Sequence, residues 1–241
     1  MTGLVRKATL LLVCGLLVSG VALANVPDPI NSSFTKSTLN FSGHDGGSAG
    51  DVFSPFTVTV KDLANVEIVG SIVVIDVSGC NDIAFCSDQL DAGVTTDCVT
   101  HTLRKTTDLA GQATFYLIGG AVVDYIGNPN GQDCNCVKIY ADGVNIVEPG
   151  DEPVNAGAFD LDNDSGVIGS DLTVWLDDAG NPGGAPLGYL RSDFDHSNAD
   201  CVTGGYVDGA DLTVWLDDAG LGTGQGGSCA QLAGPPTKCT P

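Results

Sequence analysis

The chain has 241 residues and is strongly acidic, with 30 Asp and Glu against 9 Lys and Arg and a formal net charge of −21 at pH 7. A composition of this kind offers no basic patch to the phosphates of a nucleic acid, which argues against that class of partner. All but three of the acidic residues are Asp, which favours tight oxygen-lined loops and makes calcium the natural counterion.

The first 24 residues have the three parts of a secretory signal. Arg6 and Lys7 precede an apolar run over 10–21, and Ala22-Leu23-Ala24 follows, after which we expect cleavage. A membrane anchor is the alternative, but the run is shorter than the ~20 apolar residues that a span needs. Because no second apolar stretch of that length follows, we expect no transmembrane segment and a secreted protein, extracellular or at a cell surface.

Eight cysteines follow the signal, and an even number in an exported chain indicates disulfides. They are Cys80, Cys86, Cys98, Cys134, Cys136, Cys201, Cys229 and Cys239. Proximity in the sequence suggests a Cys229–Cys239 pair and leaves the other pairings open. Half of a zinc site at Cys134 and Cys136 is a further alternative, disfavoured because no His lies near them in the sequence.

Residues 53–147 are predicted to form an antiparallel β-sandwich, because short strands alternate with turns and no helical period appears. Apolar and polar residues alternate in three segments, and a fourth segment is more uniformly apolar. These predicted strands lie at 56–61, 99–104, 113–117 and 72–77. The dipeptide Asp142-Gly143 predicts a hairpin turn between 137–141 and 144–147. The cysteine-rich residues 80–98 are expected to form a stapled loop.

The flanking segments have a different composition. Residues 25–52 are rich in Pro, Ser, Asn and Gly, which predicts an irregular lead-in. Prolines and acids at 148–156 predict a linker without a helix. Residues 221–241 form a Gly-rich tail, in which the predicted disulfide would lie.

Two phrases in 53–147 are similar to the Ig-like sandwiches of bacterial surface proteins of the invasin-repeat type. VTVKDLANVEIVGSIVVIDV, ending at Val77, pairs a strand, a turn and a crossing strand, and TTDLAGQATFYL at 106–117 pairs a turn with a buried strand. The resemblance implies an Ig-like fold for this region.

A twelve-residue phrase occurs twice, as GSDLTVWLDDAG at 169–180 and GADLTVWLDDAG at 209–220, each predicting a short helix. Asp residues alternate before the first copy in the pattern of a calcium loop, in which side-chain oxygens at positions 1, 3, 5 and 12 and a carbonyl at position 7 ligate the ion. The first set of predicted ligands is Asp160, Asp162, Asp164, Gly166 and Asp171.

The second copy follows a less regular loop. Its predicted ligands are Asp193, Asp195, Ser197, Tyr206, Asp208 and Asp211. This assignment requires an insertion at 198–204, where Asp200 is an alternative ligand to Ser197 and Cys201 could pin the loop. The sequence therefore predicts two calcium sites, the first more regular than the second.

A loop followed by a single helix, repeated, resembles a type I dockerin domain over about 157–220. The phrases that carry the resemblance are DLDNDSGVIGSDL at 160–172 and DFDHS with GYVDGADL within 193–212. It implies calcium-dependent docking to a cohesin-like extracellular protein. The partner-binding residues it implies, at loop positions 10 and 11 and on the helices, include Ser170, Ala210, Leu172, Leu212, Trp175 and Trp215. The helices carry Asp177-Asp178 and Asp217-Asp218 where family members usually carry Lys or Arg.

The sequence contains none of the common nucleophile, metalloprotease or phosphate-loop motifs, and its three His are scattered, so we expect a protein that is not an enzyme. Calcium-dependent attachment is the favoured function. In one alternative, calcium only rigidifies the end of a structural surface or filament protein that self-associates through the sandwich. In another, the sandwich binds a glycan, and Trp175 and Trp215 serve either as core anchors or in stacking on the sugar.

Overall fold

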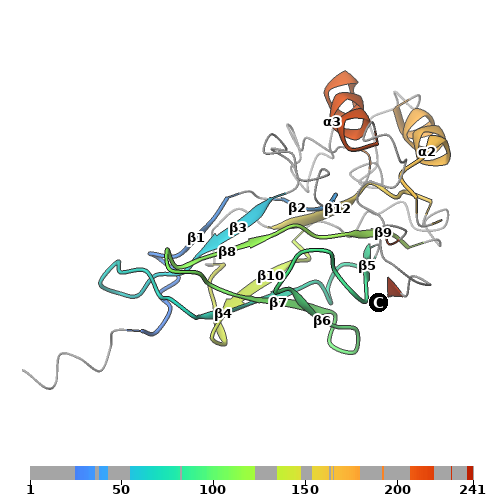
Figure 1. Cartoon of the computed structure of the whole chain (residues 1–241). Coiled ribbons are helices and arrows are strands. Elements are labelled where there is room, and N and C mark those ends of the chain that lie inside the picture. Colours follow the sequence, from blue (N-terminus) through green and yellow to red (C-terminus); the bar gives the residue numbers. More distant parts are fainter. Residues whose placement is uncertain are drawn as a thin grey trace, which may run out of the picture.

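The computed structural model describes residues 25–35, 38–42, 55–81, 83–122, 135–147, 154–162, 164, 166–179, 192, 207–219, 229 and 238–240 (Figure 1). This part of the chain is mostly β-structure, as the sequence predicts, with two helices beside the sheets. None of the described helices is both long and apolar enough to cross a membrane.

Two antiparallel sheets hold the strands predicted within 53–147. One has the order β1-β3-β8 and the other the order β11-β10-β4-β7-β6. Their bounds are β1 Ser33–Phe34, β3 Phe56–Thr59, β8 Gln112–Phe115, β11 Val144–Asn145, β10 Lys138–Ala141, β4 Ile72–Asp76, β7 Thr102–Thr106 and β6 Thr95–Asp97.

The buried faces of these two sheets share one core. Phe56 and Phe115 come from the three-stranded sheet, and Ile75, Leu103 and Ile139 come from the five-stranded sheet, all of them almost fully buried. The opposite face of β3 is polar, where the hydroxyls of Thr57 and Thr114 lie 2.8 Å apart across the strand pair. The alternation in the sequence thus separates a core face from an outer face.

The predicted hairpin at Asp142-Gly143 is confirmed. The two residues have φ of 46° and 83°, as a two-residue turn of type I′ requires, and Ala141 pairs with Val144 across it.

The predicted strand at 99–104 is wrong in its first half. Val99 is 93% exposed and lies in a turn, because Asp97 Oδ1 accepts hydrogen bonds from the backbone N–H groups of Val99 and Thr100 at 2.9 and 3.2 Å. His101 then takes a left-handed conformation with φ of 50°, and β7 begins one residue later. An Asp that caps its own turn overrides the apolar alternation.

Two further small sheets join distant segments of the chain. Strand β2, Thr38–Phe41, pairs in parallel with β12, Asn155–Ala158, and both are fully buried. Strand β5, Ile83–Cys86, lies between β9, Gly119–Ala121, and the C-terminal β13, Lys238–Cys239. The predicted irregular lead-in therefore contains β1 and β2, and the last two residues of the predicted linker, Asn155 and Ala156, begin β12. The four sheets together are called the β body below.

The described cysteines form three disulfides, Cys80–Cys136, Cys86–Cys229 and Cys98–Cys239. The predicted Cys229–Cys239 pair is wrong, because each of these residues joins a cysteine that precedes the helices by more than 60 residues. Cys136 is part of a disulfide and is no zinc ligand here. Cys134 and Cys201 lie outside the described residues.

Helices α2, Gly169–Ala179, and α3, Gly209–Ala219, match the two copies of the repeated phrase to within one residue. They lie side by side (Figure 1), and residues of both belong to one apolar cluster with Phe159 and Leu161, which follow β12 in the chain. The described residues within 159–179 and 207–219 are called the helical unit below.

Candidate metal site

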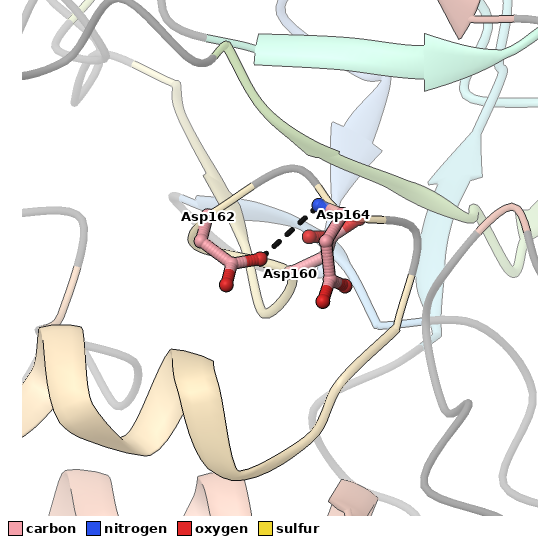
Figure 2. Close-up of side chains that lie close together, drawn as sticks. All are labelled: Asp160, Asp162 and Asp164. Atoms are coloured by element: carbon pink, nitrogen blue, oxygen red, sulfur yellow. Dashed lines mark hydrogen bonds between the residues drawn. The ribbon is translucent and has the colours of Figure 1, made fainter.

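Three carboxylates converge immediately after β12, at the entrance to the helical unit. Asp160, Asp162 and Asp164 each offer an oxygen, and these three atoms lie within 4.8 Å of one another (Figure 2). Asp160 is fully buried, Asp162 is half-buried and Asp164 is exposed, so the cluster extends from the protein interior to solvent. These are the first three predicted ligands of the first loop.

Hydrogen bonds within the loop give its alternating Asp residues their common direction. Asp162 Oδ1 accepts from the backbone N–H of Asp164 at 3.1 Å (Figure 2), and Asp164 Oδ1 accepts from that of Gly166 at 2.8 Å. Each bond closes a turn two residues long, the conformation that Asp favours, and successive turns bring every second carboxylate to the same side. Gly166, the fourth predicted ligand, is buried next to the cluster.

Asp171, the predicted closing ligand, lies fully buried in the first turn of α2. Its Oδ1 accepts hydrogen bonds from the backbone N–H groups of Leu161 and Asp162 at 2.6 and 3.2 Å, and its Oδ2 accepts from Ile168 at 2.7 Å. It therefore joins both ends of the loop to the start of the helix, as a capping carboxylate does. Its oxygens are not among the clustered atoms of the other three Asp residues.

Burial also affects the protonation of these groups. Desolvation raises the pKa of Asp171 to about 7, although the backbone N–H groups of Ile168 and Asp162 oppose the rise. Burial likewise raises the pKa of Asp160, against the opposing effect of the Lys238 ammonium. A bound cation would favour the charged forms of both carboxylates, because its positive charge would replace the stabilisation that water gives to an exposed carboxylate.

The second unit begins its helix in the same way as the first. Asp211 is fully buried and its Oδ2 accepts from the backbone N–H of Asp208 at 2.7 Å, as Asp171 does from Ile168. Asp208 is exposed and caps the helix through a 2.7 Å bond from the N–H of Ala210. The other predicted ligands of this loop, Asp193, Asp195, Ser197 and Tyr206, lie outside the described residues.

A small apolar core connects the loop to both helices. It consists of Phe159, Leu161, Val167, Trp175, Val214 and Trp215. Phe159 and Leu161 are the immediate neighbours of Asp160, so the position of the loop and the packing of the helices depend on each other.

The predicted partner-binding residues differ in how deeply they are buried. Trp175 and Trp215 are only 5% and 4% exposed and belong to the apolar core, as the core-anchor interpretation predicts, and their burial argues against direct contact with a partner or a sugar. Leu172 and Leu212 are partly buried against the same core. Ser170 and Ala210 are accessible.

Two contacts were not predicted from the sequence. Lys238 Nζ of β13 donates to Asp160 Oδ2 at 3.2 Å, across 78 positions of sequence. Ser192 Oγ donates to Asp178 Oδ2 at 2.6 Å, and both residues are buried near the end of α2. No local sequence pattern predicts either contact, because each depends on how distant segments of the chain pack together.

The donor set of the first site consists of carboxylate oxygens, which suit a hard cation such as Ca²⁺ or Mg²⁺ rather than a thiolate- or imidazole-seeking metal. Comparison of the chain with protein-family models, with curated proteins and with solved structures gave no match. The assignment of the site therefore depends on the residues themselves.

Proposed function

We propose that this is a non-catalytic, secreted calcium-binding protein whose dockerin-like helical unit attaches it to an extracellular protein partner. The observation that carries the proposal is the convergence of Asp160, Asp162 and Asp164 within 4.8 Å, directly before a helix that occurs twice in the chain. The β body, with its resemblance to Ig-like domains, would serve as the cargo or scaffold of the attachment.

Calcium would act by coupling the loop to the helices. Three carboxylates at this separation repel one another until a cation neutralises them, so the ordered loop and the bound ion stabilise each other. Because Phe159 and Leu161 belong to the apolar core, ordering the loop also fixes the packing of Trp175 and Trp215. Binding of the ion to the folded state alone would stabilise the unit by mass action.

The two helices expose equivalent side chains that could meet a partner. Thr173 and Thr213 are exposed, and Leu176 and Leu216 are 55% and 49% exposed at equivalent positions. Together with Ser170 and Ala210 they follow one another at intervals of three residues, which places them on one side of each helix. We propose this surface, rather than the buried tryptophans, as the contact with a cohesin-like partner.

Calcium titration of the full-length chain, followed by tryptophan fluorescence, tests the binding. The chain has two tryptophans, and both lie in the core of the helical unit, so the signal reports that region. We expect a saturable change with Ca²⁺ and a concurrent gain of helix by circular dichroism. The variant Asp162→Asn with Asp164→Asn should lose most of the response, and a flat trace for the wild-type chain would refute calcium binding.

A second candidate function is supported by the way the chain is attached to the β body on both sides of the helical unit. Strand β12 before the helical unit and Cys229 after it are both fixed to the β body, through β2 and Cys86 respectively. Such anchoring suits a structural protein in which calcium only rigidifies the helical unit and the sheets make the contacts with a partner or with further copies.

Surface variants distinguish the two candidates without disturbing either anchor. Leu176→Asp with Leu216→Asp should leave calcium affinity unchanged and abolish calcium-dependent capture of a cell-surface or secreted protein if the helices make the contact. Unchanged capture would favour the structural function. A variant with Thr57→Asp, on the outer face of the β body, is the matched control.

A further inference from the structure

The buried carboxylate of the metal site already faces a positive charge from the far end of the chain. The side chain of Lys238 is 12% exposed and that of Asp160 is 0% exposed, so their 3.2 Å contact is largely removed from water. Charges in such surroundings are weakly screened, and each acts strongly on its neighbours. Lys238 therefore belongs to the electrostatics of the calcium loop.

Lys238 is held at this place by the fold. In β13 it pairs with Cys86 of β5, and the next residue, Cys239, pairs with Phe85. Cys239 is also joined to Cys98 by a disulfide. The strand pairing and the disulfide together prevent the ammonium group from moving away as the end of a mobile tail would.

The opposite edge of the same small sheet fixes Asp160. The backbone N–H of Ala121 in β9 donates to the carbonyl of Asp160 at 2.7 Å. A Cβ atom at Gly120 would lie 2.7 Å from Asp160 Oδ2, so a glycine at this position allows the carboxylate to lie against the strand. Asp160 is thus held between β9 on one side and the ammonium of Lys238 on the other.

We propose that Lys238 is a tethered competitor of the metal ion, which lowers the affinity of the first loop for calcium. The inference rests on the proposed calcium binding. A divalent ion ligated by Asp160 must share that carboxylate with an ammonium group and is repelled by it. Lys238 also reduces the charge of the three-carboxylate cluster from −3 to −2, and calcium loops are tuned by their ligand charge. Lys238 would place the site toward the weak range of extracellular modules, on the order of 10⁻⁴–10⁻³ M.

The test is calcium binding by isothermal titration to the full-length, oxidised chain and three variants. Lys238→Met removes the charge, Lys238→Arg keeps it, and Lys138→Met removes a charge from the exposed position 138 of β10. We expect Lys238→Met to bind calcium about tenfold more tightly than the wild type, because the competing charge is gone. The other two variants should stay close to the wild-type affinity.

Each outcome has one meaning. Equal or weaker binding by Lys238→Met, with calcium still bound by the wild type, would overturn the competition and leave Lys238 with a purely structural part. If no variant bound calcium, the proposed function itself would fail. Lys238→Gln keeps a hydrogen-bond donor for Asp160 without the charge, and it replaces Lys238→Met in the same comparison should that variant not fold.

Discussion

The β body and the helical unit are stabilised by different means. The β body buries aliphatic and aromatic side chains from strands throughout the chain in one cluster, whereas the helical unit encloses six buried apolar residues. In the β body, this apolar burial offsets the loss of chain entropy, and the disulfides Cys80–Cys136 and Cys98–Cys239 constrain the chain further. A core of six residues buries much less apolar surface, and the Asp-rich loop beside it adds repulsion, so we expect the folding of the smaller region to depend on a cation.

The charges on the helices add to this difference. Each described helix has an Asp in its first turn, where negative charge is favourable, and none has a basic residue in its last turn, where positive charge would be. Near the end of α2, Asp178 is buried and bonded to Ser192, while Asp177 is exposed. The described residues of the helical unit include no Lys or Arg, so its positive charge must come from outside, from Lys238 and, as proposed above, from an ion.

Chelation should separate the two regions most clearly. In EDTA we expect the amides of α2 and α3 to exchange with deuterium at rates close to those of an open chain, while the amides of β4, β7 and β10 remain protected, because only the helical unit depends on the ion. Hydrogen-exchange mass spectrometry with and without calcium measures both regions at once. Equal protection of α2 and α3 under the two conditions would contradict the dependence on calcium.

Core truncations should act on one region at a time. Trp175→Ala should cost the helical unit about 3–5 kcal/mol, enough to prevent its folding even in calcium, whereas Ile75→Ala should cost the β body about 2–5 kcal/mol. Thermal unfolding in calcium, followed separately by near- and far-ultraviolet circular dichroism, checks the separation. The matched control is Leu176→Ala, next to Trp175 but 55% exposed, with an expected effect within about 0.5 kcal/mol.

Removal of one negative charge should change the stability of the helical unit in opposite directions at two positions of α2. Asp171→Asn weakens three charged hydrogen bonds to backbone N–H groups and should destabilise the helical unit by about 1–3 kcal/mol. Asp177→Asn removes an exposed charge from the unfavourable end of the helix and should stabilise the unit by about 0.3–1 kcal/mol. Unfolding by urea in saturating calcium measures both. Destabilisation of equal size by the two substitutions would show that Asp171 has no special part in the loop.

Acidification should partly replace the ion. In the calcium-free chain, the raised pKa of Asp171, about 7, means that the folded unit binds more protons than the unfolded one between roughly pH 4 and 7. Stability from this group is therefore present at low pH and lost as the pH rises through 7, amounting to about 2 kcal/mol between pH 5.5 and 7.5. Circular dichroism in EDTA should show more helix at pH 5.5 than at pH 7.5, and Asp171→Asn should reduce that difference. Less helix at pH 5.5 would contradict the prediction.

Local signals in the sequence predicted much of this molecule. Alternation located β3 and β8, an apolar run located β4, and the Asp142-Gly143 turn located β10 and β11, because these features depend on neighbouring residues. The repeated phrase located both helices, and the spacing of Asp160, Asp162 and Asp164 predicted that their carboxylates would meet.

The errors concern contacts between distant segments. The composition of 148–156 predicted a linker, but its described residues 154–156 are buried, and Asn155 and Ala156 pair with β2. Proximity favoured a Cys229–Cys239 disulfide, whereas the fold brings each to a partner more than 140 positions away. The contact of Lys238 with Asp160 follows from the same return of the tail, and a pattern confined to a dozen residues carries no information about it.

The two long disulfides also set the order in which the molecule can mature. Cys86 and Cys98 are synthesised 143 and 141 residues before Cys229 and Cys239, and the whole helical unit lies between them in the chain. Neither cysteine can form its native bond until the tail has been synthesised and has returned to β5. Formation of these two native bonds therefore cannot precede the synthesis of α3, so that a chain interrupted within the helical unit lacks both of them.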